Sequence, residues 1–408
     1  MKNLIKTMRK THLLCLFMIL GLTSTGAAQF SSNYTGKATV NKTDVVELKV
    51  THASDVIVNT TESNEVSFTV SVNIDADDEV ETEVKELLKG ISYEIEQKPG
   101  KLVLDLKSPF KNFRQTDWWF FGVSTKIELV DGREFVFEGK VNFDMVIHVN
   151  MPQGNDLQVD GAFSTIDLGY LDGSIDLDIS HSTLKGNDLG PLNINAQFSK
   201  INVGNVLGDS KIKLSHSKMS SLQMKDVSTK LSFSTLEING VKNLKSEKLE
   251  HSKLVLETAE EIDIEKSYFS TLDVHEAKDI RLGVYQHGKI LVDDAAKFDL
   301  KDGAFAKMSI GTIHHHIYVN AAHSNMEVKH ISKEVASIEI KNQFATVDIN
   351  TEAISDFDLY VTNGRFTKVK NRGDGIEKKA DGYFKKRLTS NSVINIDINC
   401  PHCTVNIN

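Results

Sequence analysis

The phrase FSTIDL, which begins at Phe163, decides the fold because variants of it recur along the chain at a nearly fixed distance. The next variants are HSTLKG from His181, FSKINV from Phe198 and HSKMSS from His216. Each begins with a ring, and phenylalanine and histidine alternate; the series continues through Phe233, His251, Phe269, His287, Phe305, His323 and Phe344. The spacing is 17 or 18 residues up to His323. A fixed period near 20 residues is typical of a solenoid, in which each unit buries its apolar face against its neighbours.

Within a unit the apolar residues alternate with polar ones, as in Ile166 and Leu168 and again in Ile175, Leu177 and Ile179. This alternation predicts two short strands per unit. Turn residues such as Asp172–Gly173 separate them, and no unit contains a helical stretch of useful length. We therefore expect an all-β fold, a β-solenoid with rungs of about 18 residues and strands about 4.8 Å apart.

The alternation of ring types is compatible with two windings. A coil of about 18 residues would stack phenylalanine on histidine in one mixed column. A coil of about 36 residues would give one phenylalanine column and one histidine column. The sequence leaves both open.

Composition limits the classes of function. The 408 residues are 40% apolar and 25% charged, with a formal net charge of −9. A chain of this charge has no broad basic face for nucleic acid. It contains no nucleophile elbow, P-loop, zinc-protease helix or dinucleotide fingerprint. No cofactor is expected.

Residues 1–28 have the pattern of a signal peptide. Lys2, Lys6, Arg9 and Lys10 precede an apolar run of about ten residues, which is too short to cross a bilayer, and small residues follow. No other stretch is long and apolar enough to be a transmembrane segment. The mature chain is therefore expected to be exported, in the periplasm or on the outer surface of a bacterium.

Residues 29–150 are expected to form a β-rich N-terminal region with one helix at about 77–89, and residues 151–408 the solenoid. Trp118, Trp119, Phe120 and Phe121 are consecutive aromatic residues. Such a run cannot face inward as a whole on one strand, because successive side chains alternate faces. We interpret it either as a plug over the open end of the solenoid or as an exposed binding loop.

Two further groups are candidate sites. His314 and His316 in the run His314–His315–His316 would point the same way on a strand, which favours them over the ring series as metal ligands. Cys400 and Cys403 flank Pro401–His402, and in an oxidising compartment they could form a small disulfide at the end of the solenoid. His402–Cys403–Thr404 fits the repeat phrase, so we expect it to begin the last rung.

The lead-in at residues 145–159 (MVIHVNMPQGNDLQV), followed by units of the form ring–Ser–Thr/Lys, resembles the putative-adhesin β-solenoid family of bacterial envelope proteins. That family is similar to the head domain of autotransporter adhesins. The resemblance covers about residues 140–408. It implies an exported, non-enzymatic repeat protein and supplies no catalytic residues.

These observations favour an adhesin-like or envelope scaffold protein that binds an unknown protein or glycan partner. A carbohydrate-active β-helix enzyme is one alternative, and it predicts two or three carboxylates with Arg or Lys in one groove of adjacent rungs. A metal- or stress-sensing envelope protein is the other, and it would use the histidines.

Overall fold

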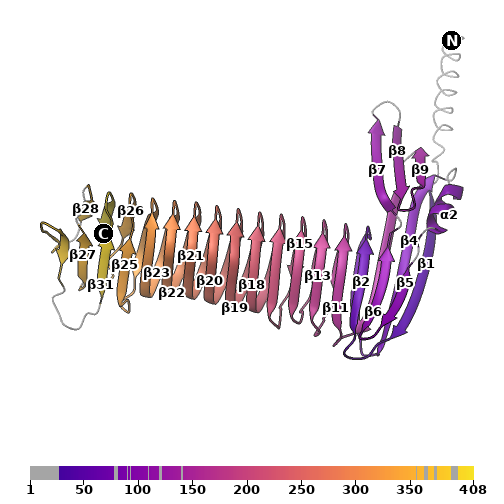
Figure 1. Ribbon diagram of the computed structural model, residues 1–408, viewed down its shortest axis with the longest axis horizontal. Coiled ribbons are helices and arrows are strands. Elements are labelled where there is room, and N and C mark those ends of the chain that lie inside the picture. The colour runs from indigo at the N-terminus through magenta and orange to yellow at the C-terminus, as the bar shows by residue number, and fades with distance from the viewer. Residues whose placement is uncertain are drawn as a thin grey trace, which may run out of the picture.

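The computed structural model describes residues 27–408 except 78–80, 90, 92, 109, 119–121, 139–140, 355, 363–365, 372–374 and 387–393. Figure 1 shows a long stack of coils with smaller sheets gathered at its N-terminal end. Among the described residues a single helix, α2 (Glu81–Lys89), accompanies the strands. The all-β solenoid expected from the repeat is confirmed.

The N-terminal sheets surround the first coils. Strand β4 (Glu65–Asp77) lies between β1 (Ala27–Thr39) and β10 (Asn142–Pro152), and both pairings are antiparallel. A separate sheet holds β7 (Phe110–Trp118), β8 (Gly122–Leu129) and β9 (Glu134–Glu138), and it projects from this end of the stack (Figure 1). The helix expected at about 77–89 is present over Glu81–Lys89, and Asp77 belongs to the sheet instead, because its backbone is paired with that of Ala27.

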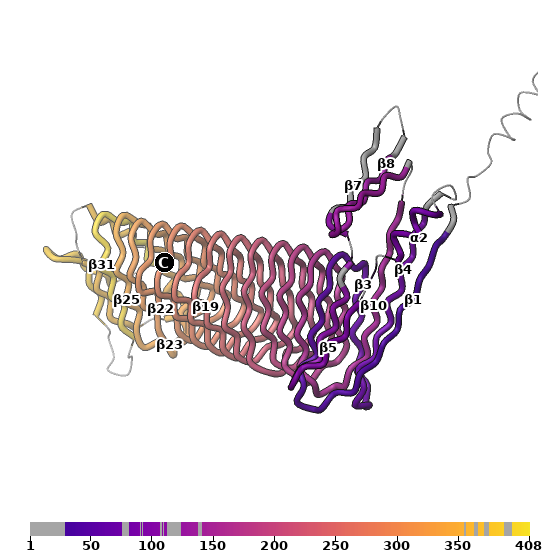
Figure 2. The backbone as a smooth tube through the Cα atoms, turned by 45° about the vertical axis from the view of Figure 1, so that its right-hand side comes forward, coloured from indigo at the N-terminus to yellow at the C-terminus, as the bar shows by residue number. Residues whose placement is uncertain are grey.

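Most coils follow one another in sequence, and Figure 2 shows them as an even winding. The register between neighbours is 17 or 18 residues, as in Leu157 beside Ile175 and Ile175 beside Leu192. The strands are β11 (Asp156–Ala162), β12 (Thr165–Leu168), β13 (Ile175–Ser180), β14 (Thr183–Gly186), β15 (Leu192–Gln197), β16 (Lys200–Val203), β17 (Ser210–Ser215), β18 (Lys218–Ser232), β19 (Thr235–Glu250), β20 (Lys253–Tyr268), β21 (Thr271–Gln286), β22 (Lys289–Ala304), β23 (Lys307–Ala322) and β24 (Asn325–Ile331).

The prediction of two short strands per unit holds only for the early coils. From β18 to β23 each strand runs for 15 or 16 residues and pairs along nearly the whole coil. In the early coils the ladder is interrupted at turns that carry Asp172–Gly173, Gly186–Asn187 and Gly190–Pro191. In the later coils Asn239–Gly240 and Asp302–Gly303 lie within the long strands instead.

The core is a set of apolar columns inside the coils. One column, three residues after each ring, is at most 1% exposed, because the alternation of the strand turns every second side chain inward. Its members are Ile166, Leu184, Ile201, Met219, Leu236, Leu254, Leu272, Ile290, Met308, Met326 and Val347.

The recurring rings occupy one corner of every coil. Each has a backbone φ between 48° and 71°, and over the described residues every non-glycine residue with positive φ is one of these phenylalanines or histidines. Phe163 stacks on His181 with a centroid distance of 4.8 Å, and His181 stacks on Phe198 at 4.9 Å. Phenylalanine and histidine therefore share one mixed column, so the 18-residue winding is correct.

The first coil comes from the N-terminal region. Strands β2 (Val45–Thr51) and β3 (Asp55–Thr61) pair in parallel with β11 and β12, and His52 between them stacks on Phe163 at 5.0 Å. The boundary expected at residue 151 therefore leaves out one coil. The other neighbour of β2 is β6 (Lys101–Lys107), which in turn pairs with β5 (Glu94–Lys98), and the other neighbour of β3 is β10.

At the C-terminal end the order of coils in space departs from the sequence. Strand β31 (Asn395–Asn399) pairs with both β25 (Ser337–Lys341) and β27 (Asp358–Thr362). Likewise β32 (Thr404–Ile407) pairs with both β26 (Thr346–Ile349) and β28 (Lys368–Asn371). The expectation that His402 begins the last rung is wrong: its coil is inserted between two earlier ones. A hairpin of β29 (Glu377–Lys378) and β30 (Gly382–Lys385) pairs with β27 at the outer edge.

Candidate functional site

The rings form a continuous surface feature, which we call the ring ladder. In spatial order it consists of His52, Phe163, His181, Phe198, His216, Phe233, His251, Phe269, His287, Phe305, His323, Phe344, His402 and Phe366. With neighbours about 4.8 Å apart, the ladder is about 60 Å long.

The ring ladder presents ring edges to solvent, not ring faces. Neighbouring rings lie within 26° of parallel, so each inner ring is covered on both faces. The phenylalanines nevertheless remain more than half exposed, for example 52% for Phe233 and 54% for Phe269. Burial lowers the pKa of His52 at the N-terminal end, and its Nδ1 is buried without a hydrogen-bond partner.

A buried serine ladder runs beneath the ring ladder. The backbone N–H of Ser199 donates to Ser217 Oγ at 3.0 Å, and Ser217 Oγ–H donates to the carbonyl of Ser215 at 2.8 Å. The same arrangement joins Ser164, Ser182, Ser199, Ser217, Ser234, Ser252 and Ser270. These hydroxyls satisfy amide groups that the turn at each ring removes from the sheet ladder, which explains the Ser after the ring in the repeat phrase.

Beside the ring ladder lies a shallow groove of about 500 Å³, which we call the ladder groove. One side is formed by the edges of His181, Phe198, His216 and Phe233. The other side is the row of residues two positions after each ring, which the strand turns outward: Thr183, Lys200, Lys218 and Thr235. Lys218 Nζ lies 2.8 Å from Glu237, whereas Lys200 has no ion pair among the described residues.

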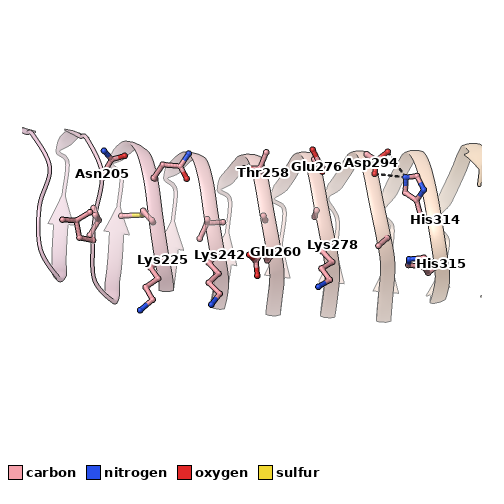
Figure 3. Close-up of a pocket in the computed structure, with 18 of the residues that line it drawn as sticks. Asn205, Lys225, Lys242, Thr258, Glu260, Glu276, Lys278, Asp294, His314 and His315 are labelled. Carbon is pink, nitrogen blue, oxygen red and sulfur yellow. Dashed lines mark hydrogen bonds and ion pairs between the residues drawn. The ribbon is translucent and has the colours of Figure 1, made fainter. Parts of the chain in front are cut away.

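A second groove, the corner groove, follows another edge of the solenoid between residues 205 and 334 and has a volume of about 1030 Å³. Figure 3 shows Asn205, Thr258, Glu276 and Asp294 along one margin. Lys225, Lys242, Glu260 and Lys278 follow the opposite margin, one from each of four successive coils. Between the margins lie apolar side chains, including Val206, Met224, Val241 and Ala277. The groove crosses successive coils and therefore suits an extended ligand.

A third groove of about 530 Å³ contains the combination expected for a carbohydrate-active enzyme. Asp226, Glu261 and Asp263 line it together with Lys211, Lys245 and Arg281. Arg281 lies 3.4 Å from Glu261, and Asp226 accepts a hydrogen bond from Asn243. Two other outward carboxylates lie outside this groove and have lysine partners: Glu237 lies 2.8 Å from Lys218, and Asp273 lies 3.2 Å from Lys253.

The two predicted metal ligands have separate partners. His314 Nε2 lies 3.1 Å from both carboxylate oxygens of Asp294, as Figure 3 shows, at the end of the corner groove. His316 Nδ1 contacts Ser337 Oγ at 2.7 Å, and its Nε2 lies 3.4 Å from Asp299. A register shift between β22 and β23 falls at this run. Over the described residues, no group of three or more His, Cys, Asp or Glu side chains is arranged to hold a metal ion.

The aromatic run lies at the β7–β8 hairpin. Trp118 is the last residue of β7 and is paired with Gly122, the first of β8. Trp119, Phe120 and Phe121 lie outside the described residues. Both interpretations of this run stay predictions.

Cys400 and Cys403 form a disulfide, with their Cα atoms 5.6 Å apart. Cys403 takes the position that serine holds after the ring in other coils, and both cysteines are buried. In the coil that begins at His402, the disulfide therefore lies at the corner where a serine hydroxyl, such as that of Ser217, lies in other coils.

Sequence reasoning missed two features of the ring ladder. His52 was not assigned to the series, although His52–Ala53 precedes an alternating strand as the other rings do. The row beside the rings was visible in the repeat phrase as Thr or Lys, but only the structure shows that it borders a groove.

Comparisons with known proteins give similar chains but no family assignment. No family model matches the chain. No curated protein matches it significantly. Similar solved structures include a "putative cell adhesion protein" from Clostridium sporogenes, with 9% identity over 93% of this chain and 99% of that chain and a TM-score of 0.20.

Two more similar structures are those of bacterial proteins. A "putative adhesin" from Bacteroides fragilis is 13% identical over 71% of this chain and 97% of that chain, with a TM-score of 0.24. A "putative lipid binding protein" from Parabacteroides distasonis is 13% identical over 76% and 97%, with a TM-score of 0.23.

The helix α2 has nine residues. Among the residues that the structure describes, no helix is both long and apolar enough to span a bilayer.

Proposed function

We propose that this chain is an exported, non-enzymatic β-solenoid that acts by contact, as an adhesin-like or cell-envelope scaffold protein. The observation that carries the proposal is the long corner groove, along which each successive coil contributes polar or charged side chains to the margins. Rows of this kind suit weak binding to several equivalent groups of one ligand, and such contacts gain strength by their number. The pattern of a signal peptide at residues 1–28 supports export.

Binding of the purified chain to an array of bacterial and host glycans tests this proposal. A Lys225→Ala/Lys242→Ala variant tests the corner groove, and a Trp118→Ala/Trp119→Ala variant tests the aromatic run. We expect the chain to bind at least one extended glycan and the lysine variant to bind it more weakly. If no glycan binds and no protein is retained from envelope extract, the contact function is contradicted.

A carbohydrate-active enzyme is the second candidate, supported by the carboxylates and cations in the groove around Asp226 and Arg281. The same array decides between the two. Any glycan that binds is incubated with the chain, and new reducing ends are measured with Asp226→Asn alongside. Release of reducing ends that the variant abolishes would favour the enzyme.

A further inference from the structure

The ladder groove combines positive charge with a regular arrangement of side chains. Around His216, the outward rows on the two sides of the ring ladder carry lysines from three neighbouring coils. Lys200 lies beside Lys218 on one side, and Lys213 lies beside Lys230 on the other. Lys218 and Lys230 each have one carboxylate partner, Glu237 and Glu247, at 2.8 Å. Lys200 and Lys213 have no ion pair among the described residues.

A net positive patch on a chain of charge −9 attracts an anionic ligand. We propose that the ladder groove binds the acidic sugars of a linear polysaccharide that lies along the solenoid axis. This inference rests on the proposed contact function and names its ligand class.

The spacing of the cations favours a polysaccharide over a nucleic acid. Neighbouring lysines in the row are one coil apart, roughly 4.8 Å. Double-stranded DNA carries one negative charge per ~1.7 Å of its axis, so most of its phosphates would have no partner in this groove. A polysaccharide with one carboxylate for each sugar or each pair of sugars has the lower charge density that the row can match.

The ring edges fit the same ligand. His181 and His216 are separated by Phe198, with stacking distances of 4.9 and 4.8 Å, so imidazole edges recur about every 10 Å. In a polymer of alternating acidic and neutral sugars, the acidic sugars could contact the polar imidazole edges and the neutral sugars the apolar phenylalanine edges. The hydroxyls of Thr183 and Thr235 lie in the same row as the lysines and can bind sugar hydroxyls.

The repeat itself supplies matched variants. Lys200→Thr/Lys218→Thr installs the residue that Thr183 and Thr235 already provide in this row, and it removes two charges from the ladder groove. Lys289→Thr/Lys307→Thr makes the same change in two adjacent coils of the same row, outside the groove. His216→Phe keeps a ring that the neighbouring coils tolerate at the same φ and removes the imidazole edge.

The probe is hyaluronan, which alternates acidic and neutral sugars, and dextran is the neutral comparison. Affinity is measured for the intact chain and each variant, and circular dichroism melting confirms that the variants fold. We expect hyaluronan binding that the Lys200/Lys218 variant weakens about tenfold, which the His216 variant weakens less and the Lys289/Lys307 variant leaves unchanged. Dextran should not bind at the ladder groove.

Equal loss in both lysine double variants would mean a general charge effect and would overturn the inference, as would the absence of hyaluronan binding. Neither result contradicts the proposed contact function if the chain binds another glycan or an envelope protein through the corner groove. Failure of the ligand class and failure of the proposed function are thus separate outcomes.

Discussion

The middle of the solenoid and its C-terminal end are built from similar coils, but they differ in the order in which the chain supplies them. Between Phe163 and Phe344 each coil stacks on the one that precedes it in sequence. Beyond Phe344 the next ring in space is His402, and Phe366 comes after it. The ring types show what this difference means.

In sequence the alternation breaks at the C-terminal end, because Phe344 is followed by a second phenylalanine, Phe366. In space it does not break. His402 lies between the two, 4.7 Å from Phe344 and 5.3 Å from Phe366. Phenylalanine and histidine therefore alternate between coils that are neighbours in the stack, even where these coils are not neighbours in the sequence. The alternation thus reflects a packing requirement in addition to the repetition of the sequence.

Two physical reasons favour unlike neighbours. Two protonated imidazoles stacked about 5 Å apart would repel each other, and an intervening phenylalanine doubles their separation. A coil that stacked one coil away from its proper place would put a ring against another ring of the same type. The alternation therefore also disfavours a wrong register.

The largest difference between the two regions should appear when the inserted coil loses a core side chain. Ile398 is fully buried, and Ile398→Ala should cost about 2–5 kcal/mol locally. The outer coil finds its parallel partners only in β31 and β32 among the described strands. We therefore expect hydrogen exchange to accelerate in β27, β28, β31 and β32 together.

The matched control for that prediction is Ile201→Ala in the middle of the stack, where the side chain is 1% exposed. There the neighbours on both sides continue the chain, so exchange should increase in the altered coil and its direct neighbours only. Acceleration restricted to β31 in the Ile398 variant, with β27 and β28 still protected, would show that the outer coil does not depend on the inserted one.

A smaller effect is expected from the serine ladder of the middle coils. Ser217→Ala removes the acceptor for the buried N–H of Ser199, so about 1–3 kcal/mol of the free energy of unfolding should be lost. Urea unfolding followed by circular dichroism measures the loss. Ser220→Ala, on the outward side of the same coil, is the control and should change stability little. Equal effects at both positions would contradict a structural role for the ladder.

The sequence predicted the middle of the molecule well because its period lies along the chain. The period identified the solenoid, the inward columns and the row of Thr and Lys after each ring. It could not predict the inserted coil, because a repeat search compares each unit with the next in sequence. The signal was nevertheless present: two successive phenylalanines, Phe344 and Phe366, and one histidine, His402, in the repeat phrase.

The grooves were less predictable than the fold for a related reason. A groove depends on how far side chains of neighbouring coils extend, and one sequence shows only which residues face outward. His314 illustrates the limit. The run of three histidines suggested a metal pair, whereas the register shift beside Ala295 and Lys297 places His314 against Asp294 and His316 against Ser337.

The smallest expected effect tests the alternation in the ring ladder itself. Phe233→His would place three imidazoles in succession, at His216, residue 233 and His251, with centroid distances near 5.0 and 4.8 Å. Two unit charges at this distance repel by about 1 kcal/mol in water. Because imidazoles gain charge as the pH falls from 8 to 5, the variant should lose stability relative to the natural chain on acidification and match it at pH 8.

His251→Phe is the complementary variant, since it creates three successive phenylalanines, which carry no charge at either pH. Its stability relative to the natural chain should therefore not fall on acidification. Urea midpoints at pH 5.5 and pH 8 for the three chains provide the measurement. If Phe233→His is as stable as the natural chain at both pH values, repulsion between like rings does not explain the alternation, and protection against register slips remains as its physical reason.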